Sequence, residues 1–250
     1  MRIELERLRK EIEYHNKLYY EQDSPEISDY EYDKLTQRLK QIEKEHPELI
    51  TKNSPTQKVG GKTKNIFTQV THDVQMQSLQ DVFSLEEVEE FVDKVKEEYG
   101  DRTDFCVETK IDGLSVSLEY ENGVLKRGST RGDGFVGEDV TQNIMQIKDI
   151  PYRLKSNDTI EVRGEVFLPR KEFEKINEEL LLKDKPQLSN PRNAAAGTLR
   201  QLDSELVKKR NLSIFIFNVQ KGKSFTTHYE SLDYLDSVGM NTIKLRFLCK

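Results

Sequence analysis

The spacing of apolar residues changes along this chain from a helical repeat to an alternating one, which restricts the folds open to it. Up to residue 46, apolar residues recur three or four positions apart, the spacing of one helix face. They are Leu5, Leu8, Ile12, Leu35, Leu39 and Ile42. Asp23-Ser24-Pro25 interrupts the repeat, and Ser28 with Glu31 forms a capping-box pattern. We therefore expect two helices, the second ending at His46-Pro47.

Farther along, the alternating repeat predicts strands. Residues 105–107 and 114–120 alternate, Asn122-Gly123 is a strong two-residue turn, and residues 124–130 can return as the partner strand. Further strands are expected at 160–168 and 212–219, and helices around 173–182, 194–199 and 229–238. Hairpins among separate helices predict an α+β fold, in which a small helical amino-terminal module precedes a mixed, largely antiparallel sheet flanked by helices.

The module and the main domain are expected to meet near residue 62. Residues 52–65 are rich in Lys, Thr, Gly and Pro and form the best candidate linker, so we expect domains at 1–62 and 63–250. A second capping-box pattern at Ser84 and Glu87 predicts a helix whose apolar side chains point inward. These side chains are Leu85, Val88, Phe91, Val92, Val95 and Tyr99.

Composition limits where such a chain can work. No stretch approaches the ~18 consecutive apolar residues of a membrane span, and the charged amino end lacks a signal-peptide core. We therefore expect a cytoplasmic protein with no membrane partner. Cys106 and Cys249, the two cysteines, form no CxxC pair, so neither a disulfide framework nor a structural zinc site is expected.

Charges are segregated within a formal net charge of −6. Residues 81–104 contain ten acids and three bases, a net charge of −7, whereas residues 183–210 contain seven bases and three acids, a net charge of +4. A phosphate-binding protein needs a local positive field rather than a positive total, so nucleic acid is not excluded. Both runs can equally be solvated helix faces.

Glu108 and Lys110 lie in a short segment between two predicted strands. On an extended chain they share one face while Val107 points to the other, which places an acceptor and an amine in one pocket. Gly113 lets the chain bend beside a ligand. Because Lys-x-Asp-Gly is also common in surface turns, the wider context has to decide.

Four ordered motifs supply that context. They are Lys110-Ile111-Asp112-Gly113, Thr130-Arg131-Gly132-Asp133-Gly134, Glu161-Val162-Arg163-Gly164-Glu165-Val166-Phe167, and Asn190-Pro191-Arg192-Asn193-Ala194-Ala195-Ala196-Gly197 followed by Leu199-Arg200-Gln201. Their order resembles that in bacterial NAD-dependent DNA ligases. With Asp29-Tyr30-Glu31-Tyr32-Asp33 and Ser54-Pro55-Thr56, the similarity covers essentially the whole chain.

The resemblance implies transfer of AMP from NAD to a lysine, then to a DNA 5′-phosphate, and then sealing by a 3′-hydroxyl. Lys110 matches the nucleophile, whose amine must lose a proton before it attacks. The matched cofactor-binding positions are Glu108 for the adenine amino group, Arg131 for phosphate or ribose, Glu165 for the ribose hydroxyls, Ser78 and Leu79 for the adenosine pocket, and Phe217 for stacking on adenine.

The same resemblance makes residues 1–62 an NMN-recognition module and residues 63–250 a nucleotidyltransferase (adenylation) domain. The positions it implies for NMN are Tyr19, Asp29, Tyr32 and Asp33, with Tyr30 and Glu31 in the same motif. Alternatively, Tyr32 is core and the acids only favour the amino end of a helix. Tyr20 stands where some family members carry His, so its role is left open.

Arg192 and Arg200 match positions that hold the phosphates of nicked double-stranded DNA, a task that suits the guanidinium fork, although each can instead form a structural ion pair. Phosphoryl chemistry and the family both imply Mg²⁺. No metal ligands are assigned, and a monomer is expected.

The departures from the family pattern affect the expected activity. Family members carry, downstream, a strand with an Asp-Gly motif and two further lysines that hold the AMP phosphate, whereas Asp-Gly occurs here only at Asp112 and Asp133 and the sequence ends at Lys250. One such charge donor is worth roughly 3–4 kcal/mol in the transition state. We therefore expect an adenylation domain incomplete at its carboxyl end, which binds NAD or NMN weakly, adenylates Lys110 slowly or not at all, and does not seal nicks alone.

Two other functions fit parts of the sequence: an ATP-dependent nucleotidyltransferase, which shares the lysine motif, and a non-catalytic nucleotide- or DNA-binding remnant. Residues 132–137 also match the GxGxxG pattern of a Rossmann dinucleotide site. The preceding strands form a hairpin rather than a βαβ unit, and Asp133, Glu138 and Asp139 would repel a pyrophosphate, so we do not expect that fold.

Overall fold

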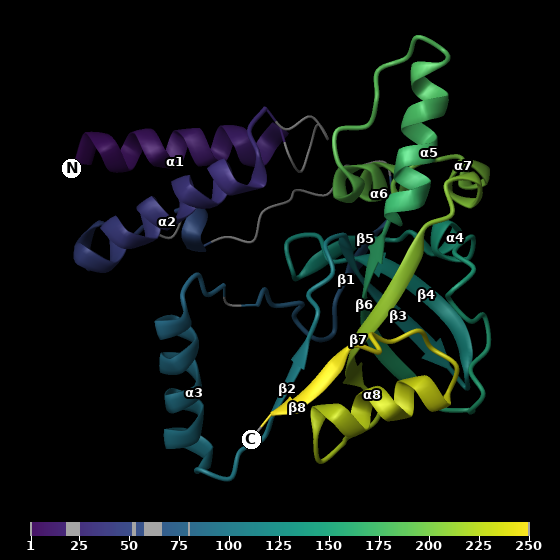
Figure 1. Cartoon of the computed structure of the whole chain (residues 1–250). Coiled ribbons are helices and arrows are strands. Elements are labelled where there is room, and N and C mark those ends of the chain that lie inside the picture. The colour runs from purple at the N-terminus through teal and green to yellow at the C-terminus, as the bar shows by residue number, and fades with distance from the viewer. Residues whose placement is uncertain (1, 19–25, 52–53, 58–66, 80, 250) are drawn as a thin grey trace.

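The computed structural model describes residues 2–18, 26–51, 54–57, 67–79 and 81–249 (Figure 1). Its helices are α1 (Arg2–Asn16), α2 (Asp29–Glu45), η2 (Pro47–Leu49), η3 (Pro55–Gln57), α3 (Leu85–Tyr99), α4 (Thr141–Ile144), α5 (Arg170–Leu181), α6 (Pro191–Leu199), α7 (Ser204–Lys209) and α8 (His228–Ser237). Its strands are β1 (Gln69–Thr71), β2 (Phe105–Glu108), β3 (Leu114–Glu121), β4 (Val124–Thr130), β5 (Val136–Glu138), β6 (Ile160–Phe167), β7 (Ser213–Lys221) and β8 (Arg246–Cys249). The α+β class expected from the sequence is confirmed.

The first two helices pair through the apolar stripe that their spacing predicts. Leu5, Leu8 and Ile12 of α1 pack against Leu39 and Ile42 of α2 in a small separate core. The predicted capping box starts α2: the Ser28 hydroxyl accepts from the Glu31 backbone N–H, and the Glu31 carboxylate accepts from the Ser28 N–H. The helix ends at the expected place, because its carboxyl-terminal cap is His46.

A buried carboxylate ties the segment after α2 to this helix pair. Glu43 forms an ion pair with Arg9 at 2.9 Å and accepts a hydrogen bond of 2.6 Å from the Ser54 hydroxyl. The Thr56 hydroxyl donates to the other carboxylate oxygen. Burial by itself raises the pKa of Glu43, but these three partners together hold it below the ordinary value. Ser54-Pro55-Thr56 thus has a structural role in fixing η3 to the helices.

The main domain is built on a four-stranded antiparallel sheet in the order β4-β3-β6-β7. The β3–β4 hairpin turns at Asn122 and Gly123, whose φ angles of 50° and 75° are the two positive values that a type I′ turn requires. The expected hairpin is therefore confirmed. Two smaller antiparallel pairs, β1–β5 and β2–β8, accompany this sheet.

Strand β6 separates the core from the polar face of the sheet. Ile160, Val162 and Val166 enter the apolar core, which also receives side chains from α6 and α8. Arg163 and Glu165 alternate with them and so emerge on the opposite face. An antiparallel sheet commonly packs one face on the core and keeps the other polar, so this charged row lies on the face where the sheet can contribute to a site.

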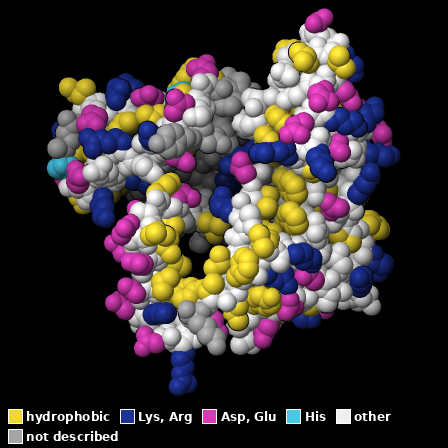
Figure 2. All heavy atoms as spheres, in the orientation of Figure 1, with side chains coloured by type: hydrophobic (Ala, Val, Ile, Leu, Met, Phe, Trp, Pro, Cys, Tyr) yellow, Lys and Arg dark blue, Asp and Glu magenta, His cyan; other side chains and the backbone are white. Residues whose placement is uncertain are grey.

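Helix α3 forms where predicted, but its apolar face is not buried. Leu85 is 78% exposed and Phe91 48% exposed, and the Phe91 ring makes an edge contact with Phe105 at 6.4 Å. Figure 2 shows apolar side chains gathered over α3 and the β2–β8 pair. The expectation that this face points inward was wrong, because periodicity shows which face can be buried and not whether anything packs against it.

The GxGxxG match forms no dinucleotide site of the Rossmann kind. Asp133 accepts hydrogen bonds from the Phe135 and Val136 backbone N–H groups, and the loop leads into β5, which pairs with β1. A Rossmann site needs a helix to begin directly after the glycines.

Within the described part of the chain, no helix is both long enough and apolar enough to cross a bilayer.

Candidate functional site

A cavity of about 900 Å³ lies between the α1–α2 pair and the main domain. Figure 2 shows the molecule hollowed in this region, between that pair, α3 and the main body. The cavity wall combines Tyr32 and Asp33 of α2 with side chains from the loop after β2, the polar face of the sheet, and α6. Its volume is within the range of ligand sites, at the upper end, and so suits a large ligand.

Lys110 lines this cavity and is exposed to it. It lies just after β2, and Glu108, two residues earlier, lines the same wall, whereas Val107 does not. Gly113 ends the segment where a side chain would not fit, since a Cβ there would come within 2.2 Å of the Val166 carbonyl oxygen. The backbone of β6 therefore holds the lysine loop close against the sheet.

Glu165 and Phe217 form the floor of the cavity. Burial raises the pKa of the Glu165 carboxyl, although the charges of Arg192, Lys110, Arg131 and Arg163 act in the opposite direction. The Arg163 guanidinium carbon lies 5.5 Å from the centroid of the Phe217 ring, within cation–π range. A flat ligand can stack on Phe217 only from the side that Arg163 leaves open.

Arg163 is fixed by hydrogen bonds from beneath the cavity. Its Nε donates to the Ser115 hydroxyl at 3.1 Å, and its Nη1 donates to the Gln77 carbonyl oxygen at 2.8 Å. Burial lowers the pKa of this guanidinium somewhat, helped by the nearby charge of Arg131. The bond to Gln77 anchors the segment that carries Ser78 and Leu79, which line the cavity as well.

Arg131 also lines the cavity. It follows β4, and its Nη1 lies 3.5 Å from the Ser78 hydroxyl, at the limit of a hydrogen bond. Arg131, Ser78, Leu79, Glu108, Glu165 and Phe217, all predicted from separate stretches of sequence, line one continuous wall with Lys110.

The two arginines matched to DNA phosphates both make ion pairs. Arg192 lies 2.9 Å from Asp112, and Arg200 lies 3.1 Å from Glu138. The Arg192 side chain is 30% exposed, whereas the side chains of Arg200 and Glu138 are 14% and 2% exposed. The structural ion pairs considered from the sequence are therefore present, and only Arg192 also has substantial contact with solvent.

The positions matched to NMN divide into three groups. Tyr32 and Asp33 line the cavity, and the Tyr32 hydroxyl donates to Asn16 at 2.7 Å while its ring packs on the module core. Glu31 is not among the described lining residues, since its carboxylate closes the capping box. Tyr19 and Tyr20 lie outside the described residues, as do the side chains of Asp29 and Tyr30.

This geometry agrees with two matches to known protein families. Residues 64–250 match the family model described as NAD-dependent DNA ligase adenylation domain, and residues 1–60 match the model described as DNA ligase-like, N-terminal NAD+-binding domain. The chain belongs to the NAD-dependent DNA ligase family.

Named relatives in this family are considerably longer. The DNA ligase of Acetivibrio thermocellus is 54% identical over 246 residues, which cover 97% of this chain and 37% of the relative. That of Thermoanaerobacter sp. is 51% identical over 247 residues, and that of Clostridioides difficile is 47% identical over 249 residues. In each comparison the chain spans 37% of the length of the curated relative that it matches.

In this NAD-dependent DNA ligase chain, the side chains of the cavity wall to which sequence reasoning gave no role include Arg163, Cys106 and His228. His228 begins α8 and lies 2.6 Å from a Glu108 carboxylate oxygen, although 120 residues separate the two. Cys106 and Arg163 were accessible to sequence reasoning, because each lies two residues before an assigned residue on the same strand face. His228 carries no comparable local signal.

The described carboxylates of the ligase cavity do not fit an Mg²⁺ ion held by the protein. Asp112 and Glu138 are paired with arginines, and Glu165 is surrounded by positive charge. Magnesium needs several hard oxygen ligands around one point, usually carboxylates together with phosphates and waters. These described residues provide no such carboxylate cluster.

Proposed function

We propose that this chain accepts AMP from NAD on Lys110, for later transfer to the 5′-phosphate at a nick in double-stranded DNA. One observation carries the proposal: a single cavity contains Lys110, the polar face of the sheet with Phe217, and two side chains of the amino-terminal module. A domain division near residues 1–62 and 63–250 is part of the same proposal, with the module serving the NMN half of the substrate.

Two buried polar atoms of the cavity wall support a nucleotide ligand. Glu108 Oε2 and Asn193 Nδ2 are buried and have no hydrogen-bond partner among the described residues. An unsatisfied buried group costs about 1–3 kcal/mol, which a ligand can relieve. We assign Glu108 Oε2 to the adenine amino group, which donates, and Phe217 to stacking on the adenine ring.

The remaining residues of the wall are assigned by the charge that each offers. Glu165 accepts hydrogen bonds from the ribose hydroxyls, Arg131 faces the phosphates, and Ser78 and Leu79 border the adenosine. Tyr32 and Asp33 hold the NMN half, with Asp29, Tyr30, Glu31 and Tyr19 proposed to assist from the same module. Arg192, the more exposed of the two arginines, is proposed to meet the DNA phosphates, with Arg200 behind it.

The proposed chemistry is one displacement at the α-phosphorus of the adenylate. The Lys110 amine, having lost a proton, forms a P–N bond as the P–O bond to NMN breaks, and NMN leaves carrying its phosphate. This step needs the amine and the leaving oxygen of NMN on opposite sides of the α-phosphorus, and binding adenosine on the sheet and NMN on α2 would hold the phosphorus for that in-line attack. Mg²⁺, when bound with the phosphates of NAD, would neutralise their negative charge. We also propose that the protein acts as a monomer in the cytoplasm.

The test is incubation of the 250-residue chain with NAD labelled in its adenylate moiety. We expect a covalent adduct that Lys110→Ala abolishes. Lys126→Ala is the control, since this exposed lysine lies on the β4 side of the sheet, away from the cavity lining.

Each alternative function gives a different result. Labelling from ATP and not from NAD would favour an ATP-dependent nucleotidyltransferase. Thermal stabilisation by NAD without any adduct would favour a non-catalytic binding protein. An adduct that survives in Lys110→Ala would contradict the assignment of the nucleophile.

A further inference from the structure

One cluster of metal-ligating side chains in the cavity wall includes two residues, Cys106 and His228, that the proposed adenylation chemistry does not use. Cys106 and Glu108 lie two residues apart on β2 and so share one face of the strand. His228 approaches this face from the first residue of α8. Among the described residues, these three form the one group whose thiol, carboxylate and imidazole ligand atoms all lie within 4.8 Å of one another.

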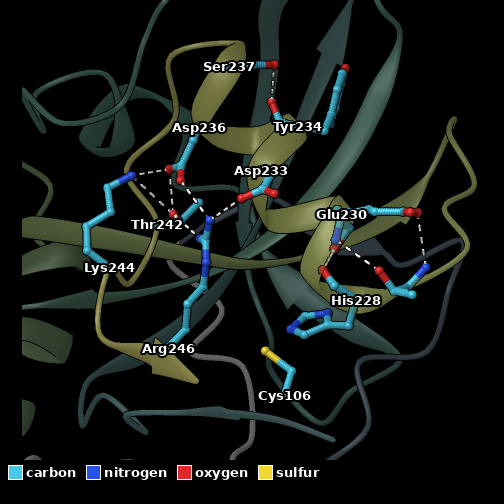
Figure 3. Close-up of polar contacts among 12 residues, drawn as sticks. Cys106, His228, Glu230, Asp233, Tyr234, Asp236, Ser237, Thr242, Lys244 and Arg246 are labelled. Atoms are coloured by element: carbon cyan, nitrogen blue, oxygen red, sulfur yellow. Dashed lines mark hydrogen bonds and ion pairs between the residues drawn. The ribbon is translucent and has the colours of Figure 1, made fainter. Parts of the chain in front are cut away.

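The contacts within the cluster show how it is arranged. Glu108 Oε1 lies 2.6 Å from His228 Nε2 and 3.8 Å from Cys106 Sγ. Glu108 Oε2 is buried and has no hydrogen-bond partner among the described residues. Figure 3 shows the Cys106 sulfur turned toward the His228 ring, with Arg246 nearby.

We propose that Cys106, Glu108 and His228 form a binding site for a soft divalent cation of the Zn²⁺ class. Thiolate, imidazole and carboxylate are the three ligand types that Zn²⁺ binds most often, and three protein ligands leave a fourth position for solvent or another ligand. All three residues line the cavity, so this open position faces the space assigned to the nucleotide.

The site needs only a small local adjustment. A tetrahedral Zn²⁺ site with bond lengths of about 2.0–2.3 Å has ligand–ligand edges of roughly 3.3–3.6 Å. The His228–Glu108 contact therefore opens by about 0.7 Å when the metal replaces the hydrogen bond. The His228 side chain is 41% exposed and can make this movement. On binding, the Cys106 thiol releases its proton to solvent and the sulfur becomes an anionic ligand.

The metal and the nucleotide would use the same carboxylate. If Glu108 receives the adenine amino group, as the proposed function holds, a cation bound to Glu108 excludes adenine. We therefore infer that Zn²⁺ inhibits nucleotide binding by competition. This second step rests on the proposed function, whereas metal binding to the ligand-free chain does not.

Metal binding is tested by titrating the ligand-free, reduced chain with Zn²⁺ against a chromophoric chelator. We expect one site per chain, weakened at least about tenfold by Cys106→Ser and by His228→Ala. Cys249→Ser is the matched thiol control, because Cys249 lies on the neighbouring strand β8 outside the cluster. His46→Gln is the matched histidine control, since His46 forms a similar surface contact with Glu48. Both controls should bind as the unchanged chain does.

A spectroscopic readout of the unchanged chain complements the titration. Co²⁺ bound to the unchanged chain should show a thiolate-to-cobalt charge-transfer band, which depends on no variant folding correctly. The proposal would be overturned if Cys249→Ser lost as much Zn²⁺ affinity as Cys106→Ser. It would also be overturned if the unchanged chain bound Zn²⁺ no more tightly than Cys106→Ser does.

The competition is measured separately by AMP binding with and without Zn²⁺. Zn²⁺ should weaken AMP binding in the unchanged chain and have no effect in Cys106→Ser. Zn²⁺ binding without competition would leave the metal site standing and contradict the assignment of adenine to Glu108.

Discussion

Glu165 shows how a single residue can be unfavourable for stability and useful for binding. It emerges on the polar face of a central strand, where burial raises the pKa of its carboxyl despite the positive charges around it. Because this pKa is higher in the folded chain than in the unfolded chain, the protonated carboxyl favours folding relative to the charged one. That contribution is present at low pH and is lost as the pH rises through the folded pKa.

Replacing Glu165 with Gln is therefore expected to raise the melting temperature at neutral pH. The difference in melting temperature between this variant and the unchanged chain should narrow as the pH falls through the acidic range. The same change should weaken AMP binding at least about tenfold, because hydrogen bonds from ribose to a charged acceptor are lost. Thermal unfolding between acidic and neutral pH, together with AMP titration, checks both effects. Glu121→Gln, at an exposed carboxylate, is the control. A variant that is less stable at neutral pH would show that the surrounding cations outweigh burial.

At the scale of elements, two helices with similar patterns differ in what their apolar residues contact. Leu85 of α3 is 78% exposed, whereas Leu232 of α8 is fully buried in the main core. Both helices start with a side-chain cap, from Ser84 and Thr227. Glu87 completes the α3 cap by accepting from the Phe83 N–H rather than the Ser84 N–H. Local signals of this kind are sufficient to start a helix but do not determine where it packs.

Leu85→Ala is expected to change the free energy of unfolding by no more than about 0.5 kcal/mol, as for other exposed positions. Leu232→Ala is expected to cost about 2–5 kcal/mol, because it removes buried methyl groups and leaves a cavity. Urea unfolding of both variants measures the difference. A large loss of stability in Leu85→Ala would mean that the α3 face is covered in solution.

At the scale of the whole molecule, the α1–α2 pair and the main domain share one cavity while keeping separate cores. The side chains proposed to bind adenosine lie mainly on and beside the sheet, and those proposed for NMN belong to α2. Recognition of the two halves of NAD should therefore be separable by mutation.

Asp33→Ala is expected to raise the KM for NAD in Lys110 adenylation about tenfold, the loss that corresponds to one hydrogen bond to a charged group. Binding of AMP, which lacks the NMN half, should stay unchanged. Adenylation kinetics and AMP titration measure the two effects, with Glu45→Ala at the exposed end of α2 as the control. Equal losses for NAD and AMP would place Asp33 beside the adenosine instead.

Much of this structure was predictable because its signals are local. Helix spacing and caps predicted α1, α2 and α3, and the Asn122-Gly123 pair predicted the β3–β4 turn. The family resemblance pointed to Lys110, Glu108, Glu165 and Phe217, and all four line one cavity. Each of these depends on residues a few positions apart or on a recognisable series of motifs.

Other features depend on how distant segments pack. The pairs Arg192–Asp112, Arg200–Glu138 and His228–Glu108 join residues separated by 80, 62 and 120 positions. The exposure of the α3 face likewise depends on what lies opposite it. No repeat or cap encodes such relations, because the energy of a contact depends on distances that are set after the chain has folded. The sequence by itself thus predicted the main helices and strands and several residues that line one cavity, and packing settled which charges are paired and which remain available to a ligand.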